Sequence, residues 1–163
     1  MREQLAALGI VLPTVSPPKG VYVPAVRSGR HVQVSGQVPM RDGELIATGR
    51  VGAEVTPEQA RELSRQCALA ALAALDSLLG PDVDTTVRVV KVVGYVSSAD
   101  GFLGQAAVVE GAGELFLTAF GDAGRHACSV VGVGRLPLGA PVEIEVLFEV
   151  VDVVSPGAAP PFP

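Results

Sequence analysis

Cys128 is the residue of this chain whose chemistry stands out, because a thiolate can serve as a nucleophile or as an acid/base group. It closely follows Arg125 and His126 in a segment that is expected to form a strand. Side chains alternate along a strand, so His126 and Cys128 should share one face. Positive charge on Arg125 or His126 would lower the pKa of the thiol if either side chain turned toward it. Cys128 can equally be a small apolar residue that packs on a strand, as free cysteines often do.

A row of carboxylates near the C-terminal end is the second candidate group. Apolar and polar residues alternate over residues 142–150, which is the period of a strand with one buried face. The apolar positions are Val142, Ile144, Val146, Phe148 and Val150, and the intervening positions are Glu143, Glu145, Leu147 and Glu149. Any chemistry in this segment therefore belongs to the glutamate face.

The segment Ser35, Gly36 and Gln37 is a candidate ligand contact, because glycine permits a close approach of the backbone to a ligand. The simpler interpretation is the end of a strand. Tyr22 could form an aromatic wall of a pocket and offer its hydroxyl, although a strand tyrosine at an oligomer interface is equally ordinary. His31 lies at the start of a strand, where a surface role is commoner than catalysis.

Two helices are predicted. Thr56, Pro57 and Gln59 combine an N-cap, a proline in the first turn and a capping box, and apolar residues then recur at helical spacing until Gly80. Cys67 lies on this apolar stripe and is expected in the core. The second helix is expected over residues 102–120, with Asp100 as its N-cap.

Strands are predicted over residues 22–26, 31–35, 85–97, 127–133 and 141–151. Because each helix lies between strands, the expected fold is α+β, one mixed sheet with both helices on one face. The other face would then be an exposed apolar patch, which predicts a symmetric oligomer. The divisions are an N-terminal arm at 1–20, one domain at 21–152 and a disordered Pro- and Gly-rich tail at 153–163.

The composition excludes several classes of protein. The net charge is -5 and the basic residues are scattered, which argues against a nucleic-acid partner and favours a small molecule. The sequence shows no secretory signal and no run approaching roughly 18 apolar residues, so we expect a cytoplasmic protein without membrane contact. Cys67 and Cys128 should be free thiols in that compartment. The chain has no phosphate loop and no paired-histidine signature, so no metal and no other cofactor is expected.

The motifs over residues 20–150 resemble those of the Rid (reactive intermediate deaminase) family, also called YjgF or endoribonuclease L-PSP. The most specific parts are Ser-Gly-Gln-Val-Pro at residues 35–39 and the segment from Leu136-Pro137 to the Glu-Ile-Glu of residues 143–145. The longer middle segment is similar to that of a divergent branch. The resemblance implies a chorismate-mutase-like α+β barrel, assembled as a homotrimer with sites in the clefts between subunits.

The resemblance also implies a mechanism. In active members an arginine before the Leu-Pro turn binds the substrate carboxylate, and a glutamate helps to hold the water that hydrolyses an imine or enamine. Glu143 matches that glutamate, whereas Cys128 stands at the position of the arginine. A thiol supplies neither a positive charge nor two donors, so the loss should weaken carboxylate binding by about 2–5 kcal/mol. Arg125 or Arg135 could replace the arginine only by breaking the match to the Leu-Pro segment.

The expected function is therefore a Rid-like homotrimer that binds a small imine, enamine or carbonyl compound and hydrolyses or otherwise transforms it. Cys128 and Glu143 are the candidate catalytic residues. The candidate substrate-binding residues are Tyr22, Ser35, Gly36, Gln37, Arg125 and His126. Two alternatives remain: an enzyme of a specialised pathway that depends on Cys128, and a non-catalytic trimer that binds or senses a small ligand.

Overall fold

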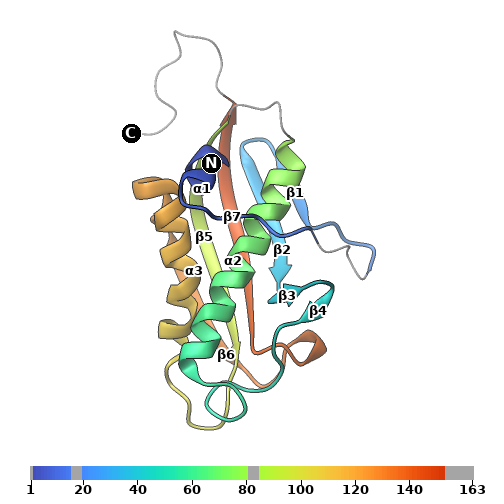
Figure 1. Cartoon of the computed structure of the whole chain (residues 1–163), viewed down its shortest axis with the longest axis vertical. Coiled ribbons are helices and arrows are strands. Elements are labelled where there is room, and N and C mark those ends of the chain that lie inside the picture. The colour runs from blue at the N-terminus through green and yellow to red at the C-terminus, as the bar shows by residue number, and fades with distance from the viewer. Residues whose placement is uncertain (1, 16–19, 81–84, 153–163) are drawn as a thin grey trace.

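A mixed five-stranded sheet with two long helices on one face forms the body of the protein (Figure 1). The computed structural model describes residues 2–15, 20–80 and 85–152, so the predicted tail at 153–163 lies outside the described residues. The helices are α1 (Arg2–Ala7), α2 (Pro57–Leu79) and α3 (Gln105–Phe120), with short 3-10 turns η1 (Gly121–Gly124) and η2 (Pro137–Gly139). The strands are β1 (Ala25–Ser28), β2 (His31–Gln37), β3 (Met40–Arg41), β4 (Glu44–Leu45), β5 (Thr85–Ser97), β6 (Ala127–Val133) and β7 (Val142–Asp152).

The strand order of the sheet is β1-β2-β7-β5-β6, and β3 and β4 form a separate small hairpin. β5 and β6 run parallel, joined through α3, and the other neighbouring strands are antiparallel. The central strand of the sheet is β7, which lies between β2 and β5. This order leaves β1 and β6 as the two edges of the sheet.

The start of α2 is the predicted one. The Thr56 hydroxyl accepts the backbone N–H of Gln59 at 3.2 Å, and the Gln59 side chain accepts the backbone N–H of Thr56 at 3.0 Å. Pro57 occupies the first turn, where its missing N–H costs no hydrogen bond. Gly80 closes the helix with φ of 74° and donates its N–H to the Asp76 carbonyl. The capping box is thus confirmed in both directions.

The start predicted for α3 was wrong, because the helix begins at Gln105 and its N-cap is Gly104 rather than Asp100. Gly101, with φ of 79°, turns the chain first. The Gln105 side chain then donates to the Phe102 carbonyl at 2.6 Å and holds the loop against the helix start. A local hydrogen bond therefore overrode the preference of Asp100 for an N-cap position.

The predicted strands agree with the sheet except at its N-terminal edge. β5 and β6 have the predicted limits, and β7 is shifted by one residue. β1 begins at Ala25 instead of Tyr22, because Pro24 has no N–H to donate to a ladder, although its carbonyl still accepts from Ser35. The tight turn that follows falls at Gly29 and Arg30, between the paired residues Ser28 and His31.

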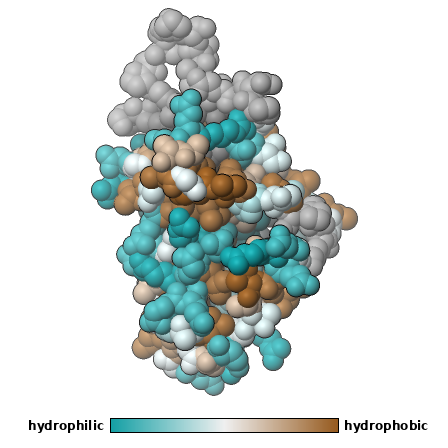
Figure 2. Space-filling view, viewed as in Figure 1, coloured by the Kyte–Doolittle hydropathy of each residue, from teal (hydrophilic) through white to brown (hydrophobic). Residues whose placement is uncertain are grey.

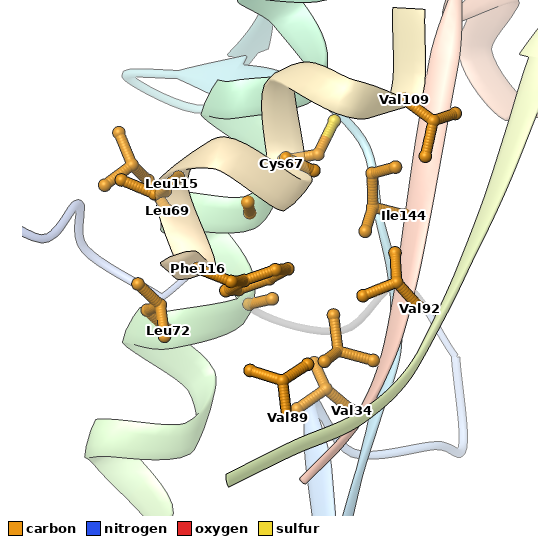
Figure 3. Packing of buried hydrophobic residues seen from close by; sticks show 14 of the residues in the cluster. Val34, Cys67, Leu69, Leu72, Val89, Val92, Val109, Leu115, Phe116 and Ile144 are labelled. Carbon is orange, nitrogen blue, oxygen red and sulfur yellow. The ribbon is translucent and has the colours of Figure 1, made fainter. Parts of the chain in front are cut away.

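The core lies between the helices and one face of the sheet (Figure 3). The alternate apolar residues of β7 are all fully buried there, as predicted: Val142, Ile144, Val146, Phe148 and Val150. Phe116 of α3 makes an edge-to-face contact with Phe148 at a centroid distance of 5.9 Å. Cys67 is fully buried in the same core, which confirms its predicted place.

The two helices approach each other closely at Gly111. A Cβ at this position would overlap the carbonyl oxygen of Arg61 on α2. The Arg61 side chain crosses the same contact and pairs with Glu110 at 3.2 Å and with Glu114 at 2.5 Å. The small size of Gly111 is therefore what allows α3 to pack on α2.

The opposite face of the sheet has no helix over it in the described part of the chain. Both long helices lie on the side that faces the viewer in Figures 1 and 2, and that side is mostly hydrophilic on its outer surface with separate apolar patches. We call the other face the open face; it carries Glu143, Glu145, Leu147 and Glu149 of β7, all partly exposed. Two helices on one face were predicted, whereas the predicted trimer is a property of several chains that this single chain does not show.

The described residues contain no helix with the length and apolar character needed to cross a membrane.

Gly111→Ala should destabilise the protein by about 1–3 kcal/mol, because the added methyl group meets backbone that cannot move without separating the two helices. Gly113→Ala is the matched control in the same helix, since its Cβ would meet only the His126 ring at 3.4 Å. That variant should be neutral or more stable by up to about 1 kcal/mol. Urea unfolding of both variants tests the contact, and equal effects would contradict it.

Candidate functional site

Glu143 is the more buried of the two predicted catalytic residues, since Cys128 is exposed. It projects from β7 on the open face, where its side chain rests on Gly36 of β2. A Cβ on residue 36 would overlap the Glu143 carboxylate, so only glycine allows the carboxylate to lie there. The pairing of β2 with β7 shifts register between Val34 and Gln37, and this bulge places Gly36 beneath the glutamate.

The side chains beside Gly36 serve the local backbone. The Ser35 hydroxyl donates to the Val23 carbonyl at 2.7 Å, and the Gln37 amide donates to the Ser35 carbonyl at 2.8 Å. The first bond holds the segment that contains Tyr22 against β2. Tyr22 itself is 55% exposed. Of the predicted contacts, Gly36 therefore meets Glu143 directly, while Ser35 and Gln37 shape the bulge.

The pKa of Glu143 is raised, first because burial removes water from the carboxylate and second because Glu145 lies two residues along the same face. Glu145 accepts a hydrogen bond from the Tyr95 hydroxyl at 3.0 Å. That bond and burial also raise the pKa of Tyr95, which keeps its proton for donation to the carboxylate. Glu143 thus has the properties of a group that can hold a proton and return it.

Cys128 lies on a different part of the sheet. It is exposed on the edge strand β6, and its partner on β5 is Val92, which is buried beneath the helices. Paired residues of neighbouring strands point to the same face, so Cys128 points toward the helix layer. His126 points the same way and makes an edge-to-face contact with Phe116 at 6.1 Å. The prediction that His126 and Cys128 share a face is confirmed.

The expected activation of the thiol by its neighbours is not found. Burial raises the pKa of Cys128, and Lys91 lowers it by a smaller amount. The Arg125 guanidinium instead pairs with Asp122 at 3.1 Å, and His126 Nδ1 donates to the Gly124 carbonyl at 2.7 Å. Both side chains bind within their own loop. The cation that lowers the pKa of the Cys128 thiol is Lys91 instead.

The predicted residues therefore form two groups that one chain does not bring together. Tyr22, Ser35, Gly36, Gln37 and Glu143 lie at the β2 and β7 side, whereas Arg125, His126 and Cys128 lie at the β6 edge. β5 separates β6 from β7, and Glu143 and Cys128 point to opposite faces. A site that uses both groups must combine residues of two chains.

Other polar residues of the open face were not predicted from the sequence. Lys91 of β5 donates to the Ser129 hydroxyl of β6 at 2.6 Å, and Tyr95 donates to Glu145 as described. A charged residue within the Val-rich strand β5 is unusual, and this could have marked Lys91 as a candidate. Its partner Ser129 could not be found in advance, because it depends on the parallel register of β5 and β6. Among the described residues, no group of three or more His, Cys, Asp or Glu side chains could hold a metal ion.

Known proteins share the sequence family and the fold of this chain. The family model described as endoribonuclease L-PSP matches residues 14–150. Protein TCP17 of Trypanosoma cruzi is 42% identical over 146 residues, which cover 89% of this chain and 91% of that protein.

Two solved structures share the fold. The protein Atu1372 of Agrobacterium tumefaciens, described as of unknown function, has a TM-score of 0.81 at 37% identity and covers 91% of each chain. The YjgF gene product of E. coli has a TM-score of 0.61 at 26% identity, with 83% of this chain and 93% of that chain covered. The α+β arrangement, the matched residues and the TCP17 relative together show that the chain belongs to the endoribonuclease L-PSP family, also known as the Rid or YjgF family.

Proposed function

We propose that this protein is a cytoplasmic homotrimer that binds a small imine, enamine or carbonyl compound in clefts between subunits and hydrolyses it with the help of Glu143. The family binds small ligands and is usually oligomeric. The observation that carries the proposal is the Glu143 carboxylate, half-buried over Gly36 with a raised pKa. A scattered set of basic residues and a net charge of -5 give no support to RNA as the substrate, in spite of the family's description.

The proposed chemistry needs one group that takes and returns a proton. Water adds to the carbon of the protonated imine while Glu143 accepts a proton from the water, and a neutral carbinolamine forms. Glu143 then donates that proton to the carbinolamine nitrogen. The C–N bond breaks, the hydroxyl proton passes to the departing ammonia, and the products are a carbonyl compound and an ammonium ion. A carboxyl group with a raised pKa suits both steps, because it is closer to neutral pH than an ordinary glutamate.

The separation of the two residue groups supports a site shared between chains. The open face lacks a covering element in the described residues, and β6 is an exposed edge. If the β6 edge of one copy met the β2 and β7 side of another, Cys128 and His126 would lie opposite Glu143 and Gly36. Each copy would then supply one half of the cleft.

A non-catalytic trimer that binds or senses a small ligand is the second candidate. It is favoured by Cys128 itself, since a neutral thiol with a raised pKa neither binds a carboxylate as arginine does nor acts readily as a nucleophile. A Cys128-dependent enzyme would need a second copy to lower the pKa of the thiol.

The first test measures ammonia release from freshly generated 2-iminobutyrate and from an uncharged imine. We expect the wild-type protein to prefer the uncharged imine, and Cys128→Arg to gain activity on 2-iminobutyrate by on the order of 10-fold or more, because arginine restores a carboxylate partner. Cys128→Ala is the control for loss of the thiol. Efficient hydrolysis of 2-iminobutyrate by both the wild type and Cys128→Ala would show that the missing arginine is not a limitation. No ammonia from any substrate with any variant would favour the non-catalytic trimer.

Glu143→Gln should abolish the hydrolysis and yet stabilise the fold near neutral pH. A raised carboxyl pKa means that the folded chain binds the proton more tightly than the unfolded chain. The resulting stability is complete below the ordinary glutamate pKa of 4.5 and is lost as the pH rises through the folded value.

The gain from Glu143→Gln should therefore be larger at about pH 7 than at about pH 4 when measured by urea unfolding. Glu44→Gln, at an exposed position of β4, is the matched control and should show no such difference. An equal effect of Glu143→Gln at both pH values would contradict the raised pKa.

Thiol labelling tests the state of Cys128. With iodoacetamide near neutral pH, Cys128 should react more slowly than free cysteine and faster as the pH rises, because its pKa is raised. Cys67 should stay unmodified until the protein unfolds, because it is fully buried. Mass spectrometry after timed labelling separates the two residues. Labelling of Cys128 faster than free cysteine would indicate a nucleophile activated by a neighbouring copy.

A further inference from the structure

Two carboxylates share the open face of β7 but differ in what surrounds them. Glu143 is half-buried over Gly36, where burial removes water from its carboxylate. Glu145 accepts a hydrogen bond from the Tyr95 hydroxyl at 3.0 Å. The two glutamates are two positions apart, which is roughly 6.6 Å along a strand. Paired carboxyl groups in unlike surroundings take different roles in proton transfer, because one of them holds the proton in preference to the other.

The strand register explains how Tyr95 reaches Glu145. Tyr95 of β5 is paired directly with Glu143 of β7, whereas the partner of Glu145 is Val93. Residues on the diagonal between neighbouring antiparallel strands remain within reach of an aromatic side chain. The Tyr95 side chain therefore extends past Glu143 and places its hydroxyl on the next carboxylate of the face. One residue of β5 thus links the two glutamates.

The charge of Glu145 acts on Glu143, and Tyr95 keeps that charge in place. Burial raises the pKa of Glu143 most, and the charge of Glu145 raises it further. The bond to Glu145 also raises the pKa of Tyr95, so the hydroxyl keeps its proton at neutral pH and remains a donor. While this bond is formed, the carboxylate cannot turn away into water, where solvent and salt would screen its charge. Glu145 is therefore a constant negative charge beside Glu143.

The other groups around Glu143 are uncharged or directed elsewhere. β2 contributes the glycine beneath the carboxylate, and α2 contributes Cys67 from the buried side of the sheet. Burial raises the pKa of the Cys67 thiol well above its ordinary value, so the thiol stays neutral. Lys91 of β5 donates to the Ser129 hydroxyl of β6 at 2.6 Å. Among the described residues, the charge that acts on Glu143 is therefore that of Glu145.

We propose that Tyr95 and Glu145 are positioning residues for Glu143: Tyr95 holds the Glu145 carboxylate in place, and this fixed charge makes Glu143 the group that takes and returns the proton. Neither residue needs to touch the substrate for this role. The pair is formed within one chain, so each copy brings it to an oligomer already assembled. The use of the proton in hydrolysis rests on the proposed function, whereas the control of the proton by this pair concerns the protein alone.

The titration of Glu143 tests this role directly. Carbon-13 NMR of the full chain, labelled in the glutamate carboxyl groups, follows each group with pH, and the spectrum of Glu143→Gln assigns the Glu143 signal. We expect Glu143 of the wild type to titrate above the ordinary value of 4.5. Glu145→Gln should move the midpoint to lower pH, because it removes the neighbouring charge. Tyr95→Phe should move it in the same direction by a smaller amount, because the released carboxylate can turn toward water.

A double variant shows whether Tyr95 acts through Glu145. Since Tyr95 is paired directly with Glu143, it could also affect that carboxyl group by itself. In the proposed arrangement, Tyr95→Phe shifts the midpoint in the wild type but not in the Glu145→Gln background. Glu149→Gln is the matched control, because Glu149 lies on the same strand and face but roughly 20 Å from Glu143, and pairs with Arg30 at 2.9 Å. It should leave the midpoint unchanged.

Ammonia release at about pH 7 connects the pair to the reaction. Glu145→Gln and Tyr95→Phe should each lower the turnover rate by roughly 2- to 10-fold with KM unchanged, whereas Glu143→Gln abolishes turnover. Unchanged turnover of Glu145→Gln in an active enzyme would overturn the role of the pair in catalysis.

The proposal is also overturned if Glu143 has the same midpoint in the wild type, Glu145→Gln and Tyr95→Phe, or if the effects of these two variants add. A shift in Glu149→Gln as large as that in Glu145→Gln would contradict it as well. If the midpoints shift as expected but the wild type releases no ammonia, the pair still controls the Glu143 proton, and it is the proposed hydrolysis that fails.

Discussion

The structure depends on the one-sided burial of its central strands. β7 is paired on both sides and alternates strictly between fully buried aliphatic or aromatic residues and partly exposed ones that are mostly glutamates. A shift of one residue in either of its pairings would move the glutamates into the core and the core residues onto the open face. The register of β2, β5 and β7 is therefore strongly determined, and with it the place of every polar side chain on the open face.

Small residues let the layers approach where larger ones would keep them apart. Gly111 brings α3 onto the backbone of α2, Gly94 leaves room for Val109 of α3 over β5, and Gly36 leaves room for Glu143 over β2. The first two contacts lie in the core and stabilise the packing. The third lies on the open face and positions the Glu143 carboxylate. The missing side chain of glycine therefore stabilises the packing on one face of the sheet and shapes the candidate site on the other.

Hydrogen bonds between neighbouring strands organise the charges on the open face. Tyr95 fixes Glu145, Glu145 in turn contributes to the raised pKa of Glu143, and Ser129 fixes Lys91. These groups come from β5 and from its two neighbours in the sheet, β6 and β7, both of which follow β5 only after α3 in the sequence. The open face therefore has an ordered pattern of charge even in the single chain, before any second copy or ligand meets it.

Local patterns in the sequence determined most of the elements. The capping box at Thr56 and the alternation of β7 involve only residues a few positions apart, so both could be recognised directly, and Glu143 could be placed on the less buried face. The start of α3 and that of β1 escaped prediction, because a side-chain bond from Gln105 and the missing N–H of Pro24 decided them. Only the tertiary structure decided that Cys128 and Glu143 point to opposite faces, that Arg125 and His126 are occupied in their own loop, and that Lys91 meets Ser129. The first and third of these facts follow from the order and register of the strands, which no short-range pattern encodes. The second depends on how the loop at residues 121–126 folds, which brings Arg125 to Asp122 and His126 to the Gly124 carbonyl.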